Sequence, residues 1–135
     1  MKNLTLLFSL FFCINVVSFA QDKENLPLVD TRWSLININD KAINKNEEGL
    51  ESFIVFAADN SFKGFAGCNK FQGNYKIENG KLSLEKIGST KMECENSNNE
   101  SEFLKTLHKA IQFKIVEHQL MLKDKNKTIA VFESK

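Results

Sequence analysis

The sequence has almost no net charge and almost no arginine, and both shortages restrict the partners that the protein can bind. Its 135 residues contain 18 lysines and arginines against 17 acids, so the formal net charge is +1. The lysines are scattered among acids, and no basic field exists to hold a polyanion, which argues against nucleic-acid binding. Arg32 is the only arginine, which weakens the case for bidentate recognition of phosphate or carboxylate.

Internal repeats and low-complexity linkers are absent, and the length allows one domain at most. Hydrophobic residues make up 42% of the chain and charged residues 26%, which is ordinary for a globular protein.

The first twenty residues have the composition of a secretory signal peptide. Lys2 gives a short basic start, residues 4–19 are largely apolar, and the segment ends in Ser-Phe-Ala. Small residues at the third and first positions before a cut suit a signal peptidase. We therefore expect a signal peptide over residues 1–20, with cleavage between Ala20 and Gln21.

Two alternatives to cleavage remain open. A retained membrane anchor is disfavoured because the apolar run is short and interrupted by Asn15. A lipoprotein anchored at Cys13 is disfavoured because the bulky Phe11 and Phe12 precede the cysteine. The mature protein is expected to be exported to the periplasm or the extracellular space, without a stable membrane span.

Export changes the interpretation of the two remaining cysteines, Cys68 and Cys94. An even count in an oxidising compartment favours a disulfide, which would close a loop of about 26 residues and contribute roughly 3.5 kcal/mol. Two separate buried thiols, or a catalytic or metal role, are the alternatives. The spacing is not C-x-x-C, and neither His108 nor His118 is near Cys68 in the sequence.

Alternating apolar residues predict strands along most of the mature chain. Residues 21–30 are expected as a loose leader and residues 31–135 as the domain. Residues 40–52 break the alternation and are expected as a surface loop. Asn79-Gly80 lies between two alternating segments, which is a strong hairpin signal. The expected strands cover residues 31–39, 53–57, 61–67, 70–78, 81–87, 113–124 (two strands) and 127–133.

Residues 98–113 show helical spacing instead. Asn99 with Glu102 three residues later resembles a capping arrangement. His108 sits beside the apolar stripe and is interpreted as a boundary residue, not as a ligand. The apolar positions are Phe103, Leu104, Leu107, Ala110 and Ile111.

These elements predict a mainly β (α+β) fold: a strongly curved antiparallel sheet or small barrel of about seven to eight strands with one α-helix. Eight phenylalanines and one tryptophan in the mature chain supply bulk for a single core.

The segment "GFAGCNKFQGNY", residues 64–75, is expected to be a turn between two strands. Two inward faces are predicted, with Phe62, Gly64, Ala66 and Cys68 on one strand and Phe71, Gly73, Tyr75 and Ile77 on the next. Asn69 suits a left-handed turn conformation. Backbone geometry explains this corner without a nucleophile.

The sequence resembles the META domain family, which includes the HslJ-type heat-shock proteins of bacteria. The resemblance rests on "WSLI", "GFAGCNKFQGNY", "TKMEC", a helix with Glu102, Phe103 and Leu107, and a final hairpin with "LML" and "AVF". It covers residues 33–132. The signature positions, interpreted as structural, are Trp33, Gly64, Gly67, Cys68, Asn69, Phe71, Gly73, Tyr75, Thr90, Met92 and Cys94.

The resemblance implies a barrel-like antiparallel sheet with one helix, often exported, and no catalytic set. Two departures stand out. Glu93 occupies a position where a small residue is common, and the turn "KDKNKT" lacks a glycine that relatives often have.

The sequence therefore predicts a non-enzymatic envelope protein with a structural or binding role, linked to stress tolerance. It is expected to be a monomer, and its partner is an unidentified envelope protein or small molecule. The alternative function is a barrel that binds a small apolar ligand, although the many phenylalanines favour a filled interior. No cofactor, catalytic residue or metal ligand is assigned.

Overall fold

The structure is a computed structural model that describes residues 27–45, 49–95 and 98–134. The expected signal peptide, its cleavage site at Ala20 and Gln21, and Cys13 lie outside the described residues.

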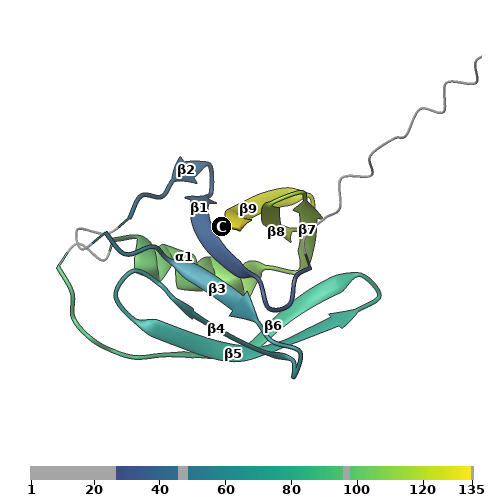
Figure 1. Cartoon of the computed structure of the whole chain (residues 1–135), viewed down its shortest axis with the longest axis horizontal. Helices are drawn as coiled ribbons and strands as arrows, with labels where there is room; N and C mark the ends of the chain where they lie inside the picture. The colour runs from purple at the N-terminus through teal and green to yellow at the C-terminus, as the bar shows by residue number, and fades with distance from the viewer. Residues whose placement is uncertain (1–26, 46–48, 96–97, 135) are drawn as a thin grey trace, which may run out of the picture.

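A single antiparallel sheet of nine strands and one helix make up the described part of the chain (Figure 1). The path through the sheet is β6-β5-β4-β3-β1-β9-β8-β7, and β2 pairs with β1 beside this path. The elements are β1 (Arg32–Ile38), β2 (Lys41–Ala42), β3 (Phe53–Phe56), β4 (Ser61–Phe65), β5 (Lys70–Glu78), β6 (Lys81–Ser89), α1 (Asn98–Lys109), β7 (Gln112–Val116), β8 (Gln119–Asp124) and β9 (Lys127–Ser134).

The sheet curls but does not close into a barrel. Its two end strands, β6 and β7, have no ladder between them. They approach each other through the N–H of Leu82, which donates to the carbonyl of Ile111 at 2.9 Å. Of the two expected architectures, the open curved sheet is therefore the observed one.

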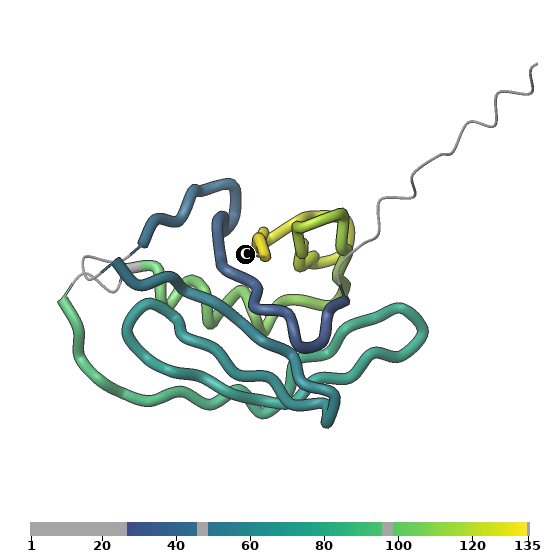
Figure 2. Tube along the Cα trace, in the orientation of Figure 1, coloured from purple at the N-terminus to yellow at the C-terminus, as the bar shows by residue number. Residues whose placement is uncertain are grey.

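Helix α1 joins the two halves of the sheet. In Figures 1 and 2 the teal strands β4 and β5 lie on one side of the helix and the yellow β9 lies on the other. The ring of Phe103 connects them, because its centroid is 5.5 Å from that of Phe71 in β5 and 5.9 Å from that of Phe132 in β9. The amphipathic stripe predicted from the sequence thus covers the concave face.

The helix ends earlier than its apolar spacing predicts. Ala110 is buried, but Ile111 lies outside the helix and is 39% exposed. The reason is that the N–H of Ile111 donates to the carbonyl of Lys123 at 2.9 Å, so the chain has already turned to run beside β8. The predicted cap is also wrong. Asn99 lies inside α1, and Glu102 contacts the β1–β2 turn, accepting from Asn39 Nδ2 at 3.0 Å.

The concave face is filled by large side chains. Trp33 is fully buried, and its Nε1 donates to the carbonyl of Leu28 at 3.1 Å. Leu28 itself is buried, so the end of the segment expected as a leader packs against the core. The largest fully buried side chains are Trp33, Phe56, Phe62, Phe103, Phe132, Ile38, Ile54, Leu107, Leu120 and Leu122.

Two hairpin turns have both central residues at positive φ. The predicted one, Asn79-Gly80, has φ values of 51° and 73° and joins β5 to β6. The second, Asn39-Asp40, has φ values of 47° and 67° and joins β1 to β2. Strand β2 was not predicted from the sequence, because two exposed residues are too few to show an alternating pattern.

Candidate functional site

Glycine and phenylalanine face each other across β4 and β5 in two reciprocal pairs. Gly64 is opposite Phe71, and Gly73 is opposite Phe62. A Cβ on Gly73 would lie 2.5 Å from the Phe62 ring, and one on Gly64 would overlap the Phe71 ring. The glycines are therefore needed because each ring occupies the space above its partner. Ile77, predicted on the same face, is 44% exposed because the β5–β6 hairpin extends beyond the core.

The turn between β4 and β5 is shaped by Gly67, not by Asn69. Gly67 has a φ of 108°, whereas Asn69 is not among the residues with positive φ. The N–H of Ala66 donates to the carbonyl of Asn69 at 2.9 Å and closes the turn. The prediction of a left-handed backbone conformation at Asn69 is thus wrong. Asn69 contributes through its side chain instead.

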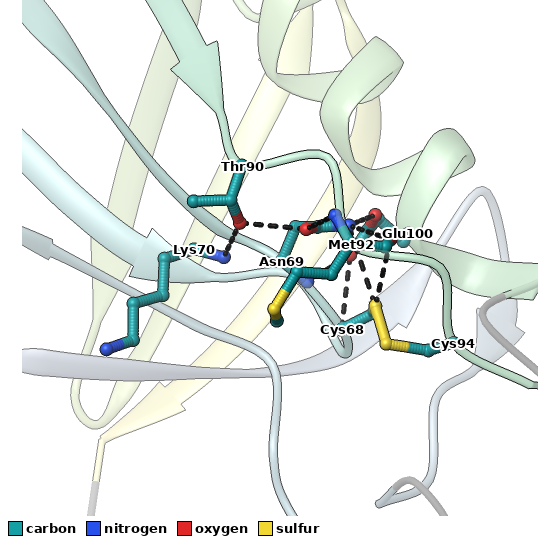
Figure 3. The surroundings of a disulfide bond; sticks show 7 residues. All are labelled: Cys68, Asn69, Lys70, Thr90, Met92, Cys94 and Glu100. Carbon is teal, nitrogen blue, oxygen red and sulfur yellow. Dashed lines mark hydrogen bonds between the residues drawn. A yellow bond between two sulfur atoms is a disulfide. The ribbon is translucent and has the colours of Figure 1, made fainter.

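The side chain of Asn69 is the centre of a hydrogen-bond network (Figure 3). Its Oδ1 accepts from Thr90 Oγ1 at 2.8 Å and from the N–H of Met92 at 2.7 Å. Its Nδ2 donates to the Met92 carbonyl at 3.1 Å and to Glu100 Oε1 at 2.6 Å. Asn69 is only 4% exposed, so these bonds satisfy an amide group that water cannot easily reach.

Glu100 connects the same turn to the first turn of α1. Its Oε2 accepts from the backbone N–H of Asn69 at 2.6 Å and of Cys68 at 3.1 Å. A carboxylate at this place is also favoured by the helix dipole. Glu100 was not among the residues predicted from the sequence. The only signal for it was an acid in the first helical turn.

Cys68 and Cys94 form a disulfide, as the sequence predicts, with their Cα atoms 6.0 Å apart. The bond links the β4–β5 turn to the segment that follows β6. In that segment Met92 contributes its backbone to the network, while its side chain is 60% exposed. Thr90 Oγ1 also accepts from the N–H of Lys70 at 3.2 Å. Glu93, the polar departure from the family pattern, is exposed.

The remaining signature residues belong to the core. Trp33 and Phe71 are buried among apolar side chains. Tyr75 is also buried, and its hydroxyl donates to the carbonyl of Ala57 at 2.8 Å. Burial, with a smaller effect from the charges of Asp59 and Asp30, raises the pKa of Tyr75 above its usual range.

The comparisons with known proteins agree with this geometry. The family model of the META domain matches residues 26–135, and the chain therefore belongs to the META domain family. An NMR structure of a protein from Burkholderia xenovorans is similar, with a TM-score of 0.66 and 25% identity over 80% of this chain and 83% of that one.

Two further structures support the fold alone, because their identities are low. A second NMR structure has a TM-score of 0.61 and 24% identity over 76% of this chain and 87% of that one. The crystal structure of a DUF4847 family protein from Bacteroides vulgatus has a TM-score of 0.53 and 17% identity, covering 78% and 93%. A search of curated proteins finds no match.

The cysteines and the carboxylate at the signature are used in structural bonds. Cys68 is bonded to Cys94 and offers no thiolate, and both oxygens of Glu100 accept hydrogen bonds. Within residues 27–45, 49–95 and 98–134, no three His, Cys, Asp or Glu side chains lie close enough to hold a metal ion. In the same residues, no helix has the length and apolar character needed to cross a membrane.

Proposed function

We propose that this META domain protein is exported and acts in the cell envelope as a non-catalytic module with a structural or binding role. The observation that carries the proposal is the Cys68–Cys94 disulfide within the signature network. Disulfides persist in oxidising compartments and are rare in a reducing cytosol. The polar groups of the signature are engaged in bonds that hold the fold, which supports a stable scaffold and not a reaction centre.

Fractionation of the native host, followed by intact mass measurement, tests the location. We expect the chain in the envelope or medium, starting at Gln21 and two hydrogens lighter before reduction than after it. A full-length cytoplasmic chain with free thiols would contradict export. A lipid on Cys13 would contradict cleavage after Ala20.

A contribution to stress tolerance is part of the proposal, and a deletion strain tests it. Survival after heat or envelope stress should fall without the gene and recover with the wild-type chain. A chain without residues 1–20 is the matched control, because it keeps the domain but stays in the cytoplasm. Equal rescue by both chains would show that export is irrelevant to the role.

Binding of a small apolar ligand is the second candidate, at the surface and not inside the sheet. The concave face is occupied by Trp33, by five phenylalanine rings and one tyrosine ring that form a chain of contacts, and by α1. A cleft on the opposite face of the sheet has the composition that such a ligand needs.

A further inference from the structure

The outer face of the sheet carries a cleft of about 450 Å³ over β1, β3, β4 and β5. Leu50, Phe53 and Phe65 supply apolar lining, and Arg32, Lys63 and Lys70 supply cationic side chains. Figure 3 shows the side chain of Lys70 extending away from the Asn69 network. The cleft is therefore separate from the Asn69 network, although Gly64 of the signature also lines it and β5 contributes to both.

The aromatic residues of this cleft are not needed by the core. Phe53 and Phe65 are directly opposite each other in the β3–β4 ladder. Their chain neighbours Ile54 and Ala66 are buried, whereas Phe53 and Phe65 remain partly exposed on the other face. Two aromatic rings side by side on a solvent-facing sheet surface are a feature of binding sites.

The single arginine of the chain lies over one ring of this pair, that of Phe53. The guanidinium carbon of Arg32 is 3.5 Å from the centre of the Phe53 ring, a cation–π arrangement that fixes the planar group at the edge of the cleft. The stacked guanidinium keeps its N–H groups in its own plane, where they can donate to an anion.

The charges of the cleft are unbalanced. Among the described residues, the cationic groups of Arg32, Lys63 and Lys70 form no ion pair. The one acid that lines the cleft, Glu51, lies 3.4 Å from Lys45 and accepts from Ser34 Oγ at 3.2 Å. Three cations thus gather around an apolar surface in a chain whose net charge is +1.

We propose that this cleft binds a small amphipathic anion: a molecule with a flat or chain-like apolar body and one carboxylate or sulfonate group. The apolar body packs against Phe53, Phe65 and Leu50, and the anionic group pairs with Arg32 and the two lysines. A neutral apolar molecule makes only the first set of contacts. The proposal makes the binding role above more specific, and it does not depend on export.

A matched pair of fluorescent probes tests the proposal on the protein purified from its host. 8-Anilino-1-naphthalenesulfonate is an apolar anion, and N-phenyl-1-naphthylamine is the same ring system without the sulfonate. We expect one site per chain, with the anionic probe bound at least about tenfold more tightly. Equal affinities, or several equivalent sites, would overturn the proposal.

Substitutions place the probe in the cleft. The triple variant Arg32→Met, Lys63→Met, Lys70→Met should lower the affinity for the anionic probe to within about twofold of the neutral one. The control Lys109→Met, Lys114→Met, Lys127→Met removes the same charge elsewhere and should bind like the wild type. If the control loses as much affinity, the attraction is not specific to the cleft and the proposal fails.

Three additional measurements complete the test. The double variant Lys63→Met, Lys70→Met leaves Arg32 on Phe53 and should show an intermediate affinity. Urea unfolding verifies that each variant is folded, because disordered chains also bind such probes. Binding to phosphatidylglycerol vesicles without binding of the soluble anion would overturn the proposal in favour of a membrane surface. None of these outcomes depends on where the protein is located in the cell, so the envelope proposal is tested separately.

Discussion

At the scale of single residues, Asn69 depends on having both a donor and an acceptor. Asn69→Asp keeps the shape of the side chain but places a second carboxylate beside Glu100, where Nδ2 now donates at 2.6 Å. We expect the free energy of unfolding at pH 7 to fall by about 3 kcal/mol, because two bonds are replaced by repulsion. Urea unfolding measures the loss.

The pH dependence of this variant provides a second measurement. Burial and the charge of Glu100 raise the pKa of the introduced carboxyl above the usual aspartic-acid value of about 4. It therefore becomes protonated as the pH falls toward 4 and can donate to Glu100 again. The deficit relative to the wild type should therefore shrink as the pH falls. Asn74→Asp on the exposed side of β5 is the matched control. A similar loss in both variants would show that the network contributes little.

Tyr75 offers a direct measurement of burial, since it is the only tyrosine. Burial raises the pKa of its phenol, so its phenolate absorbance should appear at a higher pH in the folded protein than in urea. The neutral form is favoured by the fold. This contribution to stability is complete below the ordinary pKa of about 10 and is lost as the pH rises above it.

Tyr75→Phe isolates the effect on stability. At pH 7 the variant should be less stable by about 1 kcal/mol, because the bond to the Ala57 carbonyl is lost. The difference in stability should decrease above pH 10. There the phenol of the wild type ionises more easily in the unfolded chain than in the folded one, which lowers the stability of the wild type but not of the variant. Identical phenol titrations in the folded and unfolded protein would contradict the burial argument.

At the scale of elements, the last hairpin contains a correctable strain. Lys125, in the turn between β8 and β9, has a φ of 54°, and a side chain in this conformation costs about 1 kcal/mol or more. This turn is the one where relatives often have a glycine. Lys125→Gly should therefore raise the free energy of unfolding by about 0.5–1 kcal/mol. This is the net gain, because the relief of strain is partly offset by the greater freedom of glycine in the unfolded chain.

The control for this turn is Lys127→Gly. Lys127 is exposed at the start of β9 and is opposite Asp124 in the β8–β9 ladder. Glycine in this strand position should destabilise the fold by up to about 1 kcal/mol. Thermal and urea unfolding of the two variants compare them. If both lower stability, the turn is not strained by its lysine.

Elements with a strong local signal could be predicted from the sequence, and those defined by contacts could not. Alternation and Asn79-Gly80 identify the β5–β6 hairpin because the signal is local. The end of α1 was misplaced because Ile111 continues the helical spacing, while its N–H is taken by Lys123 of β8. That competition depends on the tertiary fold, and no local pattern contains it.

At the scale of the whole molecule, the same limit applies to the two sites. The resemblance identified Asn69, Thr90 and Met92 together, but it did not show that one amide side chain binds the others. Glu100 was missed because it is 31 residues from Asn69, and only the fold brings them together. The outer cleft was missed for a related reason: Arg32 was considered alone, and its position over Phe53 depends on the pairing of β1 with β3.

The disulfide joins segments whose non-covalent contacts are already extensive, so its removal should weaken the fold without abolishing it. The double variant Cys68→Ala, Cys94→Ala keeps Asn69, Glu100 and the core packing of α1. Opening a loop of about 26 residues should lower the free energy of unfolding by roughly 3.5 kcal/mol, a large part of the roughly 5–15 kcal/mol typical of a domain. Urea unfolding of the oxidised protein, the reduced protein and the double variant measures the effect.

The reduced protein and the variant should agree, because both leave the unfolded chain unconstrained. A double variant as stable as the oxidised protein would show that the network around Asn69 holds the segment without the covalent bond.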